Sequence, residues 1–427
     1  MKEWDLKRNI FTNSLWMILE KAIAILGLIF VTSYVAKYVG TEIFGEIAYA
    51  TSLFQIVQVV SQLGSDVLIF KRISKNTKSG IKLIQSTIFI RIMIYCILSL
   101  LILFYLLKEH SEFSYVYMVA AMLSCFFSAM DVYSIYYDVN LLSKYNTIVN
   151  ALGLTITLLI RWIIAFYELK PEFLCIPIIL TGLIPFVIRF VLFRINEDSS
   201  YIPFKHMKKY IMYMIKAGST IVISSVSVAI YTRVSVIVLG FFLDKESVGV
   251  YSVAASLGMA WSFIPNSFIT SSLPSIFSEK DNSKAIVKAA NLNLLVFFVC
   301  IPFIVGGYFF GFYFIKLLYG DSYIAAYYPM VLLCIATMFA ALGTVASRFI
   351  THYSGYSFLS KKTILVLFFS LILSCFFVKY HGVTGAAISI VITEVLSLTL
   401  FNYLFNKGIV FKLHLKTVGK ALEKING

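Results

Sequence analysis

Long apolar runs alternate with short polar segments along the whole chain. Most of the runs exceed about 18 residues, which is enough to cross a hydrocarbon core roughly 30 Å thick. They lack the strict alternation of barrel strands, so they predict membrane-spanning helices. The pattern predicts about twelve spans, at residues 12–36, 43–66, 83–107, 113–137, 145–167, 171–193, 212–242, 247–274, 286–315, 325–349, 362–380 and 384–405.

The composition supports the same class of protein. The chain is 60% hydrophobic and 13% charged, whereas soluble domains are about 45–50% apolar and about 25% charged. We therefore expect an all-α polytopic membrane protein. The six cysteines lie in or beside apolar runs without a CxxC pair, so the sequence predicts no disulfide, no metal site and no resident cofactor.

Lysine and arginine residues follow the alternation of the loops. They crowd both termini and most of the alternate loops, as at 71–82 and 194–216, although one of these loops holds only Lys144; each intervening loop holds one. Under the positive-inside rule this predicts cytoplasmic N- and C-termini and an even number of spans. Most of the net charge of +15 is then a topology signal and not a nucleic-acid footprint. The first run lacks a small-residue cleavage site, so we expect it to remain in the protein.

A polar connection at 194–211 divides the predicted spans into two sets of six. The sequence therefore predicts an N-terminal lobe at 1–200 and a C-terminal lobe at 201–427 with a short basic tail. A weak internal repeat supports the division, because TEIFGEIAYATSLF (41–54) aligns without gaps to KESVGVYSVAASLG (245–258). Parallel repeats of this kind occur in secondary transporters, whose sites lie between the halves.

Several spans carry polar residues at steps of three and four, which keeps each set on one helix face. The sets are Thr51, Gln55, Gln58, Gln62 and Ser65; Ser124, Ser128, Asp131, Ser134 and Asp138; Asn146, Asn150, Thr157 and Arg161; and Thr220, Ser224, Ser227, Tyr231 and Ser235. Small polar residues also mediate ordinary helix packing in lipid. Stripes in four spans favour a shared water-filled cavity.

Charged residues inside the spans are the strongest functional signal, since each costs roughly 2.5–3.5 kcal/mol at the bilayer centre. The interior set is Glu20, Lys21, Arg91, Asp131, Arg161 and Glu394. For each residue taken singly, a structural ion pair or snorkelling to the interface is the alternative. Arg189 and Arg233 lie near span ends and are weaker candidates. Arginine suits phosphate through its planar donor fork, and intramembrane carboxylates suit proton or Na⁺ coupling.

Segments spread over the chain resemble O-antigen flippases of the Wzx type, in the polysaccharide-exporter branch of the MATE-like (MOP) superfamily. They are NSLWMILEKAIAILGLIFVTSYVAKYVGTEIFGEIAYA (13–50), LGSDVLIFKR (63–72), YTRVSVIVLG (231–240), VGVYSVAASLGMAWSFIPNSF (248–268), LLYGDSYIAAYYPMVLL (317–333) and YHGVTGAAISIVITE (380–394). Four residues match recurrent positions of that family, namely Glu20, Lys21, Asp66 and Arg72. Charged positions common in the family's second lobe are Ser235, Ser256 and Met259 here, which shifts the predicted site toward the first lobe.

The resemblance implies a non-enzymatic flippase in the bacterial cytoplasmic membrane. Such proteins move undecaprenyl-diphosphate-linked oligosaccharide between leaflets by alternating access of two six-helix lobes, driven by an ion gradient. A glycan polymerase and a chain-length regulator are the implied protein partners, and the bilayer and the lipid-linked cargo are the others.

Two groups of residues form the predicted site. The cargo-binding group is Lys21, Gln55, Gln62, Arg91, Asn150 and Arg161. The group for coupling to H⁺ or Na⁺ is Glu20, Asp131 and Glu394. The alternatives are a multidrug or small-cation antiporter of the same fold, which would want an acidic aromatic cavity, and a membrane glycan polymerase, which usually needs a large periplasmic loop that this sequence lacks.

Overall fold

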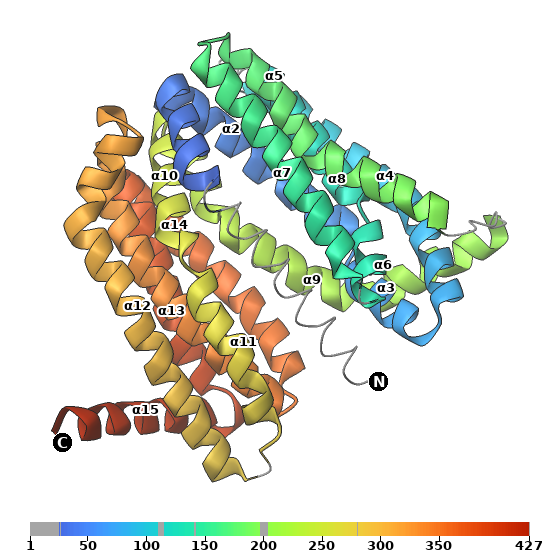
Figure 1. Ribbon diagram of the computed structural model, residues 1–427. Helices are drawn as coiled ribbons and strands as arrows, with labels where there is room; N and C mark the ends of the chain where they lie inside the picture. Colours follow the sequence, from blue (N-terminus) through green and yellow to red (C-terminus); the bar gives the residue numbers. More distant parts are fainter. Residues whose placement is uncertain are drawn as a thin grey trace. The chain divides into compact units, whose positions relative to one another are not determined.

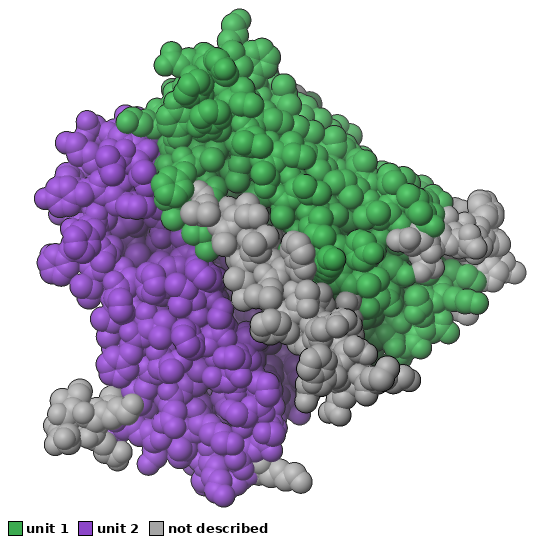
Figure 2. Space-filling view, viewed as in Figure 1, with its two compact units in different colours: residues 1–229 green, residues 230–427 purple. Residues whose placement is uncertain are grey.

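The computed structural model describes residues 25, 27–109, 115–140, 142–196, 204–279 and 281–426 (Figure 1). Nearly all of these residues are helical, and none of them lies in a β-strand. The predicted all-α fold class is therefore confirmed. The chain divides into two compact units, residues 1–229 and 230–427, which Figure 2 colours separately.

The described helices of unit 1 are η1 (Gly27–Thr32), α2 (Ser33–Gln62), α3 (Ser65–Lys75), α4 (Thr77–Glu109), α5 (Tyr115–Met130), α6 (Tyr133–Val139), α7 (Ser143–Phe166), η2 (Pro171–Leu174) and α8 (Cys175–Asn196). Helix α9 (Phe204–Phe242) begins in unit 1 and ends in unit 2. Unit 2 continues with α10 (Lys245–Ala260), α11 (Phe263–Phe277), α12 (Asn282–Leu318), η3 (Asp321–Ala326), α13 (Tyr327–His352), α14 (Tyr356–Leu396), η4 (Ser397–Phe401), η5 (Asn406–Gly408) and α15 (Ile409–Asn426).

Ten helical stretches in the described ranges are long and apolar enough to cross a membrane. Eight of them correspond one to one with predicted spans. The other two, Ile29–Gln62 and Tyr356–Phe401, each cover two predicted spans. The start of the first predicted span, residues 12–24, lies outside the described residues.

The stretch Tyr356–Phe401 is a helical hairpin. Gly382 interrupts α14 with φ +54° and ψ −133°, a conformation that suits glycine. The Ser374 and Ser389 hydroxyl oxygens lie 3.0 Å apart, whereas one continuous helix would separate them by about 22 Å at 1.5 Å per residue. The chain therefore turns back at Gly382, as the division between the spans 362–380 and 384–405 predicts. Gly40 (φ +78°) interrupts α2 in the same manner.

The span Tyr115–Val139 is broken near its middle. Helix α5 ends at Met130, and α6 begins at Tyr133. Asp131 and Val132 lie between them. A break inside a membrane span frees backbone carbonyls that must find other donors. Discontinuous helices of this kind are typical of transporter sites.

The boundary between the two compact units falls inside α9, at 229/230. The first part of α9 packs against unit 1. Met214 is fully buried in the core cluster that contains Leu68 and Tyr133. A Cβ atom on Gly218 would lie 2.7 Å from the Leu63 carbonyl oxygen. This close packing assigns residues before 230 to the first unit.

Candidate functional site

Arg91 of α4 is held by groups of its own unit. Its Nη2 donates to Asp66 Oδ1 at 2.5 Å and to the Ser65 hydroxyl, and its Nη1 donates to the Ala129 carbonyl oxygen at 2.6 Å. The side chain is 1% exposed, whereas Asp66 is 48% exposed. Ala129 O is one of the carbonyls near the end of α5, so the guanidinium helps to satisfy the broken span.

Arg189 of α8 organises a second network in the same unit. Its Nη1 pairs with Asp131 Oδ2, its Nε donates to Asn146 Oδ1 at 2.9 Å, and its Nη2 bonds to Asn150 Oδ1. The side chains of Arg189 and Asp131 are 5% and 11% exposed. A lone buried charge costs several kcal/mol, roughly 3–5. The buried pair is therefore stable only while both partners are present.

The two networks meet at the break between α5 and α6. Asn146 Nδ2 donates to the Ser134 carbonyl oxygen and to Asp138 Oδ1, both at 2.8 Å. Arg91, Arg189 and Asn146 thus donate to groups on both sides of the break. Their placement gives Arg91, Asn150 and Asp131 a structural role in this conformation. The predicted roles of these three residues in cargo binding and ion coupling stay predictions.

Arg161 of α7 differs from the other two arginines. Within the described residues, its guanidinium makes no hydrogen bond and no ion pair. The side chain borders a cavity of about 50 Å³ whose other walls are mostly apolar. They are formed by Thr32, Val35, Phe44, Ile47, Leu174 and Ile178. This volume admits a few water molecules, so a diphosphate group cannot enter it in this conformation.

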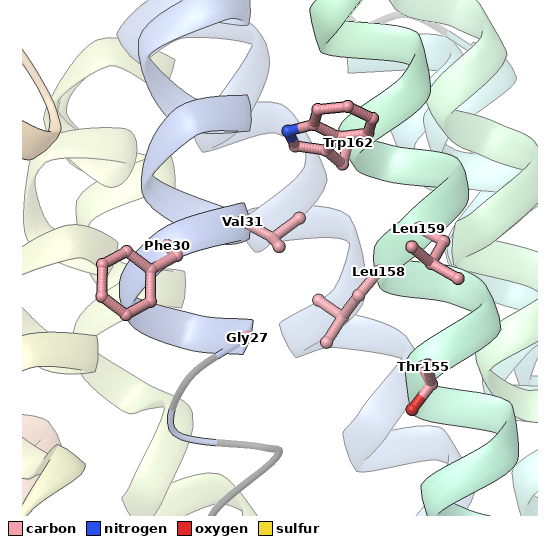
Figure 3. Close-up of a pocket in the computed structure, with 7 residues that line it drawn as sticks. All are labelled: Gly27, Phe30, Val31, Thr155, Leu158, Leu159 and Trp162. Carbon is pink, nitrogen blue, oxygen red and sulfur yellow. The ribbon is translucent and has the colours of Figure 1, made fainter.

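A larger apolar hollow lies next to this cavity along α7. Gly27, Phe30 and Val31 line it on one side, and Figure 3 shows Val31 pointing toward Leu158 of α7. The hollow has a volume of about 310 Å³, and Thr155 is its one hydroxyl-bearing side chain. The Trp162 ring closes one end and stacks on Phe166 with centroids 4.9 Å apart. Such a lining suits a hydrocarbon chain and not a charged group.

Glu394 lies in the second arm of α14, in unit 2. The Tyr231 hydroxyl of α9 donates to its Oε1. No cation pairs with the carboxylate within the described ranges. The predicted role of Glu394 in ion coupling stays a prediction.

Two further predicted residues, Gln55 and Gln62, are half-buried on α2. The Oε1 atom of Gln55 is fully buried and has no hydrogen-bond partner among the described residues. Glu20 and Lys21 lie outside the described residues. The structure also buries Glu46 of α2, which is 6% exposed. Glu46 is not among the charges that the sequence analysis singles out, although it lies inside the predicted span 43–66.

A family model described as polysaccharide biosynthesis protein matches residues 6–280, more than half of the chain. The chain belongs to this family. No curated protein sequence matches it. The resemblance inferred from the sequence is thereby confirmed at the level of the family and the superfamily fold.

Solved structures with this fold are membrane transporters. Lipid II flippase MurJ in an inward closed conformation matches with a TM-score of 0.67 and 18% identity, over 96% of this chain and 91% of that one. An inward-facing multidrug resistance MATE family transporter of the MOP superfamily gives 0.68 and 14%, over 92% and 95%. A MOP superfamily transporter from Pyrococcus furiosus gives 0.54 and 13%, over 95% and 94%. The family match and these structural likenesses show the family and the fold of the chain.

Proposed function

We propose that this member of the polysaccharide biosynthesis family is a flippase for an oligosaccharide linked to undecaprenyl diphosphate. It would act in the bacterial cytoplasmic membrane, with both termini in the cytoplasm, and move the cargo to the periplasmic leaflet. The observation that carries the proposal is Arg161, an intramembrane guanidinium with no hydrogen bond or ion pair among the described residues. An uncompensated cation inside a span is expensive unless a ligand or water meets it during the transport cycle.

The surroundings of Arg161 fit an amphiphilic cargo. The guanidinium offers paired donors for phosphate oxygens. The apolar hollow beside it, between Gly27–Val31 and Thr155–Trp162, suits a segment of a polyprenyl chain. Since the cavity at Arg161 is only about 50 Å³, the proposal requires that it open in another state of the cycle. The sequence predicts Lys21 and Arg91 as the other cations that bind the cargo head group.

Glu394 is the proposed coupling residue. Protonation would remove its charge while leaving Tyr231 within hydrogen-bonding distance. Replacement by glutamine keeps an acceptor for Tyr231 but cannot titrate. E394Q should therefore transport at a rate that no longer depends on the imposed pH or Na⁺ gradient, whereas the wild-type rate should depend on one of them.

The direct test uses the full-length protein in proteoliposomes with a fluorescent polyprenyl-diphosphate-linked oligosaccharide. Translocation is followed by quenching with a membrane-impermeant reductant. Wild-type protein should accelerate translocation, R161Q should slow it at least about tenfold, the equivalent of 1.4 kcal/mol, and R161K should retain part of the rate. The matched control is K170Q, which removes an exposed cation just beyond α7 and should leave the rate unchanged.

Two outcomes would contradict the proposal. If R161Q and wild type transport the lipid-linked cargo equally, Arg161 is not a cargo-binding residue. If the wild type fails to move this cargo but expels cationic dyes along an ion gradient, the protein is an antiporter of the MATE type.

A further inference from the structure

The C-terminal helix α15 (Ile409–Asn426) runs across the bundle of unit 2 and not along it. Figure 1 shows it crossing α12, and its hydrogen bonds with Asn291 and Asn293 place the crossing two to three turns after the start of α12. It follows the membrane span Tyr356–Phe401 after a short turn. A helix that crosses a spanning helix near its cytoplasm-proximal lysines, here Lys284 and Lys288, lies close to the plane of the membrane surface.

One face of α15 is fixed to unit 2. Val410 and Leu413 are fully buried. The Tyr403 hydroxyl and His414 Nδ1 lie 2.9 Å apart, and Lys420 Nζ donates to Asn291 Oδ1 of α12 at 2.6 Å. These contacts set the rotation of the helix, so its other faces have a defined direction.

A second face of α15 is apolar and exposed. Phe411, Leu415 and Val418 follow at steps of four and three, within an arc of about 60° at 3.6 residues per turn. They are 46%, 55% and 57% exposed. Two leucines at the end of the preceding span are exposed as well, Leu400 (57%) and Leu404 (70%).

The third face is cationic. Lys412 and Lys416 are exposed one turn apart, about a quarter turn around the helix from Leu415. A helix with an apolar stripe and flanking lysines that lies in the plane of the membrane is typical of an interfacial segment. Juxtamembrane lysines are attracted to anionic lipid headgroups.

We propose that α15 is a membrane-surface helix whose stripe of Phe411, Leu415 and Val418 inserts into the acyl boundary, while Lys412 and Lys416 bind anionic phospholipid headgroups. The occupant is lipid because α15 follows a membrane span whose end carries exposed leucines and because the lysines complement anionic phosphate. Because the buried face of α15 packs against α12, a change in the lipids bound to α15 would alter that packing.

The test places a fluorophore on α15 of the full-length protein in nanodiscs. The label is attached to Leu415→Cys in a protein whose exposed cysteine is removed by Cys96→Ala. Nitroxide groups on the upper acyl chain of phosphatidylglycerol or phosphatidylcholine serve as quenchers, compared at equal amounts. A label at Ser283→Cys, an exposed position in the first turn of α12, is the positional control.

We expect strong quenching at position 415, weaker quenching at 283, and a preference for the phosphatidylglycerol quencher. Each lysine near an anionic surface contributes roughly a fivefold preference, so K412Q/K416Q should lower the preference at least about fivefold. K170Q in the other unit should leave it unchanged. High salt should also reduce it, since the Debye length falls to about 3 Å at 1 M.

The lipid proposal is overturned if acyl-chain nitroxides do not quench the label at 415. If the label at 415 is shielded from water but not quenched, and each nanodisc holds twice the protein mass of one chain, the stripe is covered by a second copy of the chain. Equal quenching by both lipids in the wild type would overturn the assignment of Lys412 and Lys416 as anionic-lipid ligands.

Discussion

The Asp131–Arg189 pair offers a sharp test of the network around the broken span. Replacing Asp131 by leucine removes the carboxylate and leaves the Arg189 guanidinium 5% exposed. Loss of one partner from a buried ion pair costs about 3–5 kcal/mol. We expect about 3 kcal/mol, the lower end of that range, because Asn146 and Asn150 still accept from Arg189.

This loss of free energy of unfolding lowers the melting temperature (Tm) of the detergent-solubilised protein. For 150–250 residues, 1 kcal/mol corresponds to about 2–4 °C. Unit 1 spans 229 residues, so D131L should lower Tm by about 6–12 °C. R189M should lower it by a similar amount, since it leaves Asp131 buried without its cation. E172Q, a change at an exposed carboxylate, is the control and should stay within about 0.5 kcal/mol.

The double variant D131L/R189M decides between a paired and an independent role. Replacing a whole buried pair by apolar residues of similar volume is often neutral. The double variant should therefore be more stable than either single variant. If the losses of the two single variants add within about 0.5 kcal/mol, the residues do not act as a pair and our account of the network is refuted.

Three further predictions follow from other parts of the fold. G382A should destabilise the purified protein by about 1–3 kcal/mol, because its φ of +54° strains an L residue; G306A, inside helix α12 with open space around its Cβ, should be neutral or stabilising in the same melting assay. Burial lowers the pKa of His414, so the docked state of α15 binds fewer protons than the released state. The docking of α15 should weaken as pH falls below about 6.5, seen as faster amide exchange in α15, and H414Q should remove this dependence. W162A should widen the apolar hollow and slow transport of the polyprenyl cargo more than F166A, because Trp162 lines the hollow; equal rates would contradict that role.

The spans could be predicted from the sequence because their signal is local. Apolar runs and polar breaks located even the two hairpins, where Gly382 and Gly40 interrupt helices that are otherwise continuous. The boundary between the units could not be placed, because it depends on the packing of α9 against Leu63 and Leu68. No feature of residues 204–229 reveals that packing in the sequence.

The sequence identified individual charges but not their partners. Arg91 reaches Asp66 across 25 positions, and Arg189 reaches Asp131 across 58. Only tertiary packing brings such residues together, so an ion pair and a cargo site remained equal alternatives for each charge. The position of Arg189 near a span end makes it a weak candidate in the sequence. Its long side chain nevertheless carries the guanidinium into the interior of unit 1.

The polar stripe of α7 also divides in the structure. Asn146 and Asn150 bind Arg189, whereas Arg161, on the same predicted face, borders a separate cavity. Helical spacing correctly indicated a shared face. It could not indicate that Asn146 and Asn150, near the start of this face, contact other neighbours than Arg161, near its end.

The hairpin turn at Gly382 has a consequence for the biosynthesis of unit 2. The contact between Ser374 and Ser389 joins residues only 15 positions apart, so little chain entropy opposes its formation. The two arms can therefore pair with each other soon after both have entered the bilayer, before the hairpin packs against α13.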